Sequence, residues 1–197
     1  MDNVGELLRP ERIIIRAERA IGKTLEEVGL IEYLPKEPGQ KSIAILGAGV
    51  VVEAGSLRDY FVHHGLGAPK ITAYDNSWSS KRLTEELFPS KTLGLEYHTG
   101  DITEPESFKN ERYDIVLIRK PDVHNSTDTW EKAFRNGFKH LKHGGVFLAT
   151  TDLYSDFVLA QLRRGGEVVK NYTIPEIDRV GPFFNESDLF IAKKKDL

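Results

Sequence analysis

Short apolar runs alternate along this chain with longer stretches in which apolar residues recur at helical spacing. The short runs, each typical of a β-strand, cover residues 42–47, 70–74, 93–98, 113–118, 145–151, 167–172 and 188–194. The central runs are almost continuously apolar, which is typical of parallel strands that are covered by helices on both faces. Between them, helices are predicted at 52–64, 130–141 and 155–164, and a capping box at 103–106 opens a further short helix.

Strands that alternate with helices predict an α/β fold with a doubly wound, mostly parallel seven-stranded sheet and helices on both faces. The C-terminal part of the sequence differs, because no long helix is predicted between Gly166 and the last residue. We therefore expect the last two strands to form an antiparallel pair at one side of the sheet.

The first 40 residues form a separate block. Residues 9–22 have a helical pattern, a capping box at Thr24–Glu27 predicts a second helix through Tyr33, and Pro35 and Pro38-Gly39 break the pattern. We expect an N-terminal helical cap or extension at 1–40 and a Rossmann-like domain at 41–197. The N-terminal helices either cover one side of the sheet or form a lid over the ligand crevice.

The composition narrows the possible functions. The chain has 197 residues, a formal net charge of −3 and no cysteine, which excludes disulfides, cysteine-ligated metals and a thiol nucleophile. No metal site is expected. The near-neutral charge argues against a strongly basic nucleic-acid binder. The sequence start lacks a signal-peptide pattern and the longest apolar stretch is too short for a membrane span, so we expect a soluble, cytoplasmic protein.

The first predicted strand runs directly into Gly47-Ala48-Gly49, and a helix follows. Glycines permit a tight turn and bring backbone N–H groups close to a ligand, while the helix N-terminus favours negative charge. In an open α/β sheet this turn lies where ligands bind. A plain strand-to-helix turn remains the alternative.

Two carboxylates follow the next two strands. Asp75 ends the second strand, where it could accept hydrogen bonds from a ribose diol, and Asp101 follows the third, where it could accept from an adenine amine. Each of them could instead be an ordinary turn or cap residue. Together with the glycine loop, they place three candidate ligand contacts at the ends of successive strands.

The chain resembles the class I S-adenosylmethionine-dependent methyltransferase family from Ser42 to Lys195. The resemblance rests on AILGAG, Asp75, the GDI at 100–102, YDIVLI at 113–118 and LKHGGVFLAT at 141–150. It implies S-adenosyl-L-methionine as cofactor. Our leading hypothesis is a methyltransferase that acts on a small molecule. The implied cofactor contacts are Gly47, Ala48, Gly49, Asp75, Asn76, Asp101 and Ile102.

The sequence departs from the family loop at two positions. Ile45 stands where the family has an acidic residue, and Val51 stands at the third glycine. A catalytically inactive cofactor-binding module is therefore one alternative. A nicotinamide-dependent oxidoreductase is another, although Val52 replaces the third glycine of its fingerprint. Aminopropyl transfer from the same cofactor would require an acidic polyamine pocket, which Asp122 alone does not establish.

In this fold the substrate lies over the carboxyl end of the fourth strand, here Ile118 to Asn125. Asp122 and His124 are the candidate catalytic residues, because methyl transfer can require a positioned base and histidine titrates near neutral pH. The alternative is a polar loop in which Pro121 sets a turn. Pro121-Asp122 and FLATTDLYSDF also resemble tRNA guanine-N7 methyltransferases, but the aromatic and basic residues of that subfamily do not follow.

Overall fold

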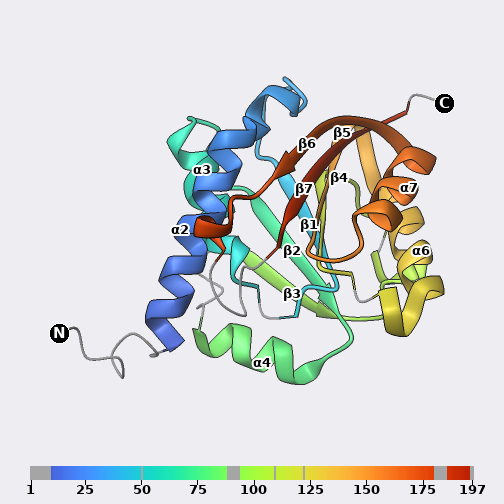
Figure 1. The fold of residues 1–197 in the computed structure, drawn as a ribbon, viewed down its shortest axis with the longest axis horizontal. Helices are drawn as coiled ribbons and strands as arrows, with labels where there is room; N and C mark the ends of the chain where they lie inside the picture. Colours follow the sequence, from blue (N-terminus) through green and yellow to red (C-terminus); the bar gives the residue numbers. More distant parts are fainter. Residues whose placement is uncertain are drawn as a thin grey trace.

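The computed structural model describes residues 10–49, 51–87, 94–108, 110–121, 123–179 and 186–195, with the backbone alone at 10–13 and 123–125. Its centre is a seven-stranded sheet of order β3-β2-β1-β4-β5-β7-β6 (Figure 1). The strands are β1 (Ser42–Leu46), β2 (Lys70–Asp75), β3 (Leu95–Thr99), β4 (Tyr113–Arg119), β5 (Leu141–Thr151), β6 (Gly166–Thr173) and β7 (Asp188–Lys194).

Helices fill the connections between the strands. The α-helices are α2 (Pro10–Val28), α3 (Glu53–His63), α4 (Trp78–Leu87), α6 (Val123–His140) and α7 (Ser155–Gly165). The short 3-10 helices are η1 (Leu30–Tyr33), η2 (Pro105–Phe108) and η3 (Glu176–Asp178). The α/β fold and the strand positions predicted from the sequence are therefore confirmed.

Strands β1 to β5 are parallel, and β7 lies antiparallel between β5 and β6. The antiparallel pair predicted at the end of the sequence is thus confirmed. The first strand, β1, lies between β2 and β4. The chain adds β2 and β3 on one side of β1 and then returns to add β4 and β5 on the other side. This position is the topological switch point, where the carboxyl ends of the strands open a crevice for a ligand.

Two apolar cores cover the two faces of the sheet, because alternate residues of each strand point to opposite sides. On one face Ile43, Ile45 and Leu117 pack with α2 and α3. On the other face Ala44 and Leu46 pack with aromatic side chains from α6 and η2. Complete burial of both faces explains why the central strands show no polar alternation in the sequence.

The N-terminal segment differs from the two predicted helices. A single 19-residue helix, α2, runs through Gly22 and Thr24, and the expected capping box is wrong. Thr24 is buried and its hydroxyl donates to the carbonyl of Ala20 one turn earlier, at 2.9 Å, instead of capping a new helix. The helix ends at Gly29, which has a left-handed φ of 64°.

Helix α2 packs beside α3 on one face of the sheet (Figure 1). Ala17, Ile21, Leu25 and Val28 are buried in the same core as the strands. Helix α2 therefore covers one side of the sheet, which is the first of the two arrangements considered for the N-terminal segment.

Candidate functional site

The glycine loop leaves β1 at the carboxyl edge of the sheet. Gly47 and Gly49 have φ values of 64° and 52°, a left-handed conformation that favours glycine. The backbone N–H groups of Gly47 and Ala48 both donate to the carbonyl of Tyr74 on β2, at 2.9 and 3.1 Å. The loop is therefore fixed to the neighbouring strand before any ligand binds.

The two glycines have different surroundings. A Cβ on Gly47 would lie 2.6 Å from the ring of Trp130, whereas a Cβ on Gly49 would meet nothing within 4 Å. Trp130 of α6 thus covers the first half of the loop. The second half faces open space, as a loop that admits a cofactor must.

Asp75 joins the loop to the end of β2. Its Oδ2 accepts the N–H of Gly49 at 2.9 Å, and its Oδ1 accepts the N–H of Ser77 at 2.7 Å. The carboxylate is half-buried and keeps lone pairs for further donors. The sequence left Asp75 as either a ligand contact or a turn residue. Its geometry is compatible with both, because it closes a local turn and also lies beside the glycine loop.

A second contact holds the loop from β3. The hydroxyl of Tyr97 donates to the carbonyl of Gly49 at 2.9 Å. Burial, followed by the nearby charges of Asp75 and Glu53, raises the pKa of Tyr97, so its hydroxyl stays protonated as a donor. Tyr97 was not identified as a site residue from the sequence.

The remaining candidate contacts lie after β2 and β3. Asn76 is exposed immediately after Asp75. Asp101 is also exposed, and its Oδ1 accepts the N–H of Thr103 at 2.8 Å. Ile102 is buried, and its side chain lies near Gly47. The structure thus brings Ile102 to the loop and leaves Asn76 and Asp101 facing solvent at the same edge.

The carboxyl end of β4 has an unusual backbone. Lys120 has a φ of 45°, in the left-handed region that side chains other than glycine rarely adopt, and strain of this kind is concentrated at functional sites. The two catalytic candidates follow it. Asp122 lies outside the described residues, and His124 lies in the first turn of α6, where only the backbone is described. Helix α6 leaves helical geometry shortly afterwards, at Ser126.

A buried charged group lies at this edge and was not predicted. Arg119, the last residue of β4, donates from Nη1 to Glu53 Oε2 at 2.7 Å and from Nε to Glu186 Oε1 at 2.8 Å. The side chains of Glu53 and Glu186 are 2% and 0% exposed, and that of Arg119 is 14% exposed. We call these three residues the Arg119 cluster.

The Arg119 cluster is incompletely paired. Among the described residues, neither Glu53 Oε1 nor Glu186 Oε2 has a hydrogen-bond partner, although both atoms are buried. Burial raises the pKa of Glu53, and the opposing effect of Arg119 does not offset it. Burial lowers the pKa of Arg119, but the two carboxylates outweigh this effect and raise it, so the guanidinium stays charged.

The sequence contains only a weak signal for this cluster. Its members are far apart, at the start of α3, the end of β4 and the approach to β7. The one local sign is an arginine that follows the apolar run of β4, at the strand end where the fold places substrates.

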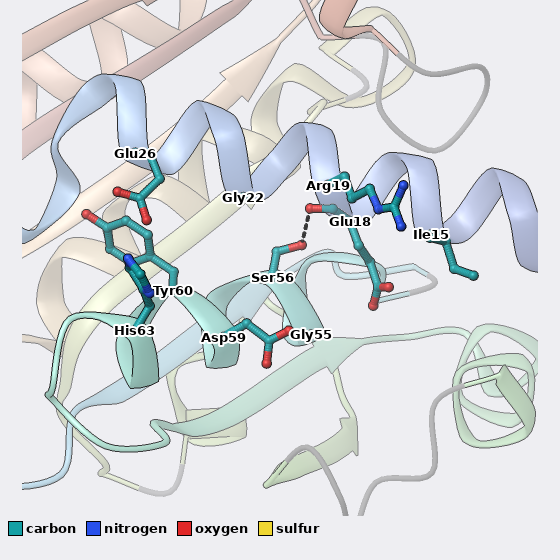
Figure 2. Close-up of a pocket in the computed structure, with 10 residues that line it drawn as sticks. All are labelled: Ile15, Glu18, Arg19, Gly22, Glu26, Gly55, Ser56, Asp59, Tyr60 and His63. Atoms are coloured by element: carbon teal, nitrogen blue, oxygen red, sulfur yellow. Dashed lines mark hydrogen bonds between the residues drawn. The ribbon is translucent and has the colours of Figure 1, made fainter.

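A groove of about 570 Å³ opens elsewhere, between α2 and α3. Figure 2 shows side chains of both helices lining it, with Ser56 Oγ donating to the backbone carbonyl of Glu18 at 2.7 Å. Burial, followed by the charge of Asp59, raises the pKa of Glu18. None of the residues expected to contact a cofactor lines this groove, so the glycine-loop edge remains the candidate site.

Within the described part of the chain, none of the helices has the length and apolar character needed to cross a membrane. Within the same residues, histidine and carboxylate side chains form no group of three that could hold a metal ion.

Comparison with known proteins gave one family match. Residues 46–149, just over half of the chain, match the family model described as a methyltransferase domain. The matched region begins at the last residue of β1 and extends into β5, so it contains the glycine loop, Asp75 and the end of β4. No sequence among the curated proteins matches the chain.

Solved structures share the fold. The PH0226 protein from Pyrococcus horikoshii OT3 superposes with a TM-score of 0.67 at 18% identity, over 90% of this chain and 91% of that chain. The N-methyltransferase NodS from Bradyrhizobium japonicum WM9 gives 0.63 at 12% identity, over 91% and 97%. The magnesium protoporphyrin IX methyltransferase ChlM from Synechocystis PCC 6803, with bound SAM, gives 0.61 at 11% identity, over 92% and 81%.

Proposed function

Because the chain belongs to the methyltransferase-domain family, whose class I members use S-adenosylmethionine, we propose that it methylates a small molecule. The bond between Asp75 and the N–H of Gly49 is the observation that carries this proposal. It places a carboxylate beside a glycine loop that faces open space, at the switch point of the sheet. The net charge of −3 favours a small acceptor over a nucleic acid.

The proposed function includes an assignment of domains. We assign cofactor binding and methyl transfer to a domain at 41–197 and treat 1–40 as a helical extension. The lack of cysteine accords with a protein that works in the cytoplasm.

The described residues suit the cofactor as follows. Asp75 would accept the two ribose hydroxyls through the lone pairs that Gly49 and Ser77 leave free. Gly47, Ala48 and Gly49 would pass beneath the methionine part, and the remaining expected contacts would flank the adenine: Asn76, Asp101 and Ile102. When bound, the cofactor supplies a methyl group on a sulfonium centre.

The chain's own contribution to the reaction is positioning and, where the acceptor needs it, proton removal. Asp122 and His124 are our candidates to take that proton, because they follow the end of β4. A His124→Ala variant should then lower the rate of S-adenosylhomocysteine release without changing cofactor affinity. Equal loss of affinity and rate in this variant would instead indicate a structural role.

Calorimetric titration with S-adenosylmethionine, S-adenosylhomocysteine and NAD tests the cofactor directly. We expect binding of the two sulfur compounds and none of NAD. Asp75→Asn should weaken S-adenosylhomocysteine binding by about ten- to hundred-fold, because charge-assisted hydrogen bonds to the ribose are lost. Asp128→Asn is the matched control, since this aspartate is 81% exposed on α6 and pairs with Lys132 at 2.8 Å on the helix surface.

Each result has a distinct meaning. An unchanged affinity in Asp75→Asn would refute the ribose contact while leaving the family assignment intact. Binding of NAD alone would overturn the proposed function. Cofactor binding without turnover on a broad panel of acceptors would favour the inactive-module alternative that Ile45 and Val51 raise.

A further inference from the structure

The Arg119 cluster carries an excess of negative charge. Within the described part of the chain, the two carboxylates pair with the same guanidinium, and Lys120, the next cation along the chain, lies 3.3 Å from Asp152. With both glutamates ionised, the cluster has a net charge of −1 in a buried position. Burying an uncompensated charge is costly, so a group of opposite sign that fits the cluster would bind favourably.

The unpaired atoms specify the chemistry of that group. Glu53 Oε1 and Glu186 Oε2 are acceptors without a donor among the described residues. A group that satisfies both the charge and the acceptors must carry N–H donors and a positive charge. A protonated amine has both properties, whereas a metal ion would need more ligands than this cluster offers.

A small cavity adjoins the cluster. Its volume is about 30 Å³, which accommodates one group the size of a water molecule or an ammonium. Glu53 and Arg119 line it, together with Thr150, whose hydroxyl lies 3.3 Å from Glu186 Oε1. The other walls are Thr24 of α2 and aliphatic side chains of α2, α3 and the strands, which would limit the access of water to a bound cation.

We propose that Glu53, supported by Arg119 and Glu186, forms a subsite for a protonated amine. This inference rests on the proposed function and adds a substrate class to it. The amine has two possible sources, which are the methyl acceptor and the α-ammonium group of the cofactor's methionine part. Both sources are compatible with the position of the cluster, because Leu46, the residue before the glycine loop, pairs with Ile118, the residue before Arg119.

The register also gives a reason for Ile45. Ile45 pairs with Leu117, two residues before Arg119, and both side chains belong to the core on the α2 and α3 face. A carboxylate at position 45 would therefore point toward the side of the sheet that already holds Glu53 and Glu186. The Arg119 cluster supplies negative charge there without an acidic residue in β1.

The test uses two variants and a control. Glu53→Gln and Glu186→Gln each remove one charge and preserve shape. Asp114→Asn is the matched control, because Asp114 is also buried and paired with a cation but lies at the opposite end of β4. Circular dichroism and thermal melts establish that each protein is folded before binding is measured.

The first measurement compares S-adenosylhomocysteine with 5′-methylthioadenosine, which lacks the amino-acid part. If the subsite holds the cofactor's ammonium, Glu53→Gln should weaken the first ligand by about ten-fold or more and leave the second unchanged. The second measurement adds ethylammonium chloride to protein saturated with S-adenosylhomocysteine, with ethanol and sodium chloride as controls. If the subsite holds the acceptor, ethylammonium should raise the melting temperature of the wild type and Asp114→Asn, but not of Glu53→Gln.

Either positive result supports the subsite and identifies its source. The proposal is overturned if Glu53→Gln and Glu186→Gln bind both nucleosides as the wild type does and ethylammonium stabilises no protein. If one variant does not fold, the other gives the same comparison. Failure of the wild type to bind S-adenosylhomocysteine would contradict the proposed function, and the ethylammonium titration of the free protein would still test the subsite.

Discussion

Strand β4 has a buried ionic group at each end, and the two groups are built differently. At its start, Asp114 Oδ2 accepts the N–H and hydroxyl of Ser42 at 2.7 and 2.8 Å and the ammonium of Lys142 at 2.8 Å. At its end, two buried glutamates share Arg119 and leave two oxygens unpaired among the described residues.

The pKa directions follow the same division. Burial raises the pKa of Asp114, but the hydrogen bonds from Lys142 and Ser42 outweigh burial and lower it. For Glu53 burial prevails and the pKa is raised. The group at the amino edge, where Asp114 Oδ2 has three donors, stabilises the sheet, whereas the group at the carboxyl edge costs folding energy and lies where a parallel sheet binds ligands.

The largest expected effect comes from removing the shared cation. Arg119→Met should destabilise the fold by about 3–5 kcal/mol near neutral pH, because two buried carboxylates lose the cation with which both are paired. Urea unfolding measures the change. The loss should shrink as the pH is lowered, because burial raises the pKa of Glu53 and this carboxylate is then protonated. A loss below about 1 kcal/mol would contradict a charged pair between Arg119 and the buried carboxylates.

Removal of the charge at the opposite end should cost less. Asp114→Asn should destabilise by about 1.5–3 kcal/mol, the usual contribution of a hydrogen bond to a charged group. Its affinity for S-adenosylhomocysteine should equal that of the wild type, which calorimetry measures. A loss of affinity in this variant would break the division between a stabilising edge and a binding edge.

Within the carboxyl edge, the two glycines of the loop are expected to differ in how much stability an alanine substitution costs. Both Gly47→Ala and Gly49→Ala introduce a Cβ at a left-handed φ, at about 1 kcal/mol each. Gly47→Ala should cost about 1–3 kcal/mol more, because its Cβ would lie 2.6 Å from Trp130. Chemical denaturation of the two variants side by side gives the difference. Equal stabilities would mean that Trp130 moves without cost.

The smallest and most specific effect is on the pH dependence of stability. Burial raises the folded-state pKa of Glu53 above its ordinary value, so its ionisation disfavours the fold, and stability falls as pH rises through the raised pKa. The pKa of Asp114 lies below 3.8, so stability falls as pH decreases through the lowered value.

Unfolding curves between about pH 3 and 7 separate the two contributions. Relative to the wild type, Glu53→Gln should gain stability with rising pH, and Asp114→Asn should lose it. Parallel pH profiles for all three proteins would contradict the opposite roles of the two ends of β4.

The sequence predicted the features that depend on local patterns. Apolar runs located the strands, and the position of Gly47-Ala48-Gly49 after the first run located the loop, because both follow from near neighbours along the chain. Asp75 was found for the same reason, as the first carboxylate after a strand.

Features that depend on distant contacts were missed. Glu53, Arg119 and Glu186 meet only after the sheet is assembled, and each alone resembles an ordinary surface charge. The false break in α2 has a related cause. Thr24 followed by glutamate matches a capping box, but burial of Ile21 and Leu25 against the sheet keeps the helix continuous through Gly22.

The position of α2 has a consequence for biosynthesis. Lys23 pairs with Asp178 at 2.8 Å at a sequence separation of 155, and Glu27 accepts from the hydroxyl of Tyr172. On the ribosome, α2 emerges long before these partners, with its apolar face uncovered. Contacts of such sequence separation form late and slow the search for the native state. Because the cavity beside Arg119 is walled by Leu25 and Leu189, the nascent chain acquires it only as the final segments dock.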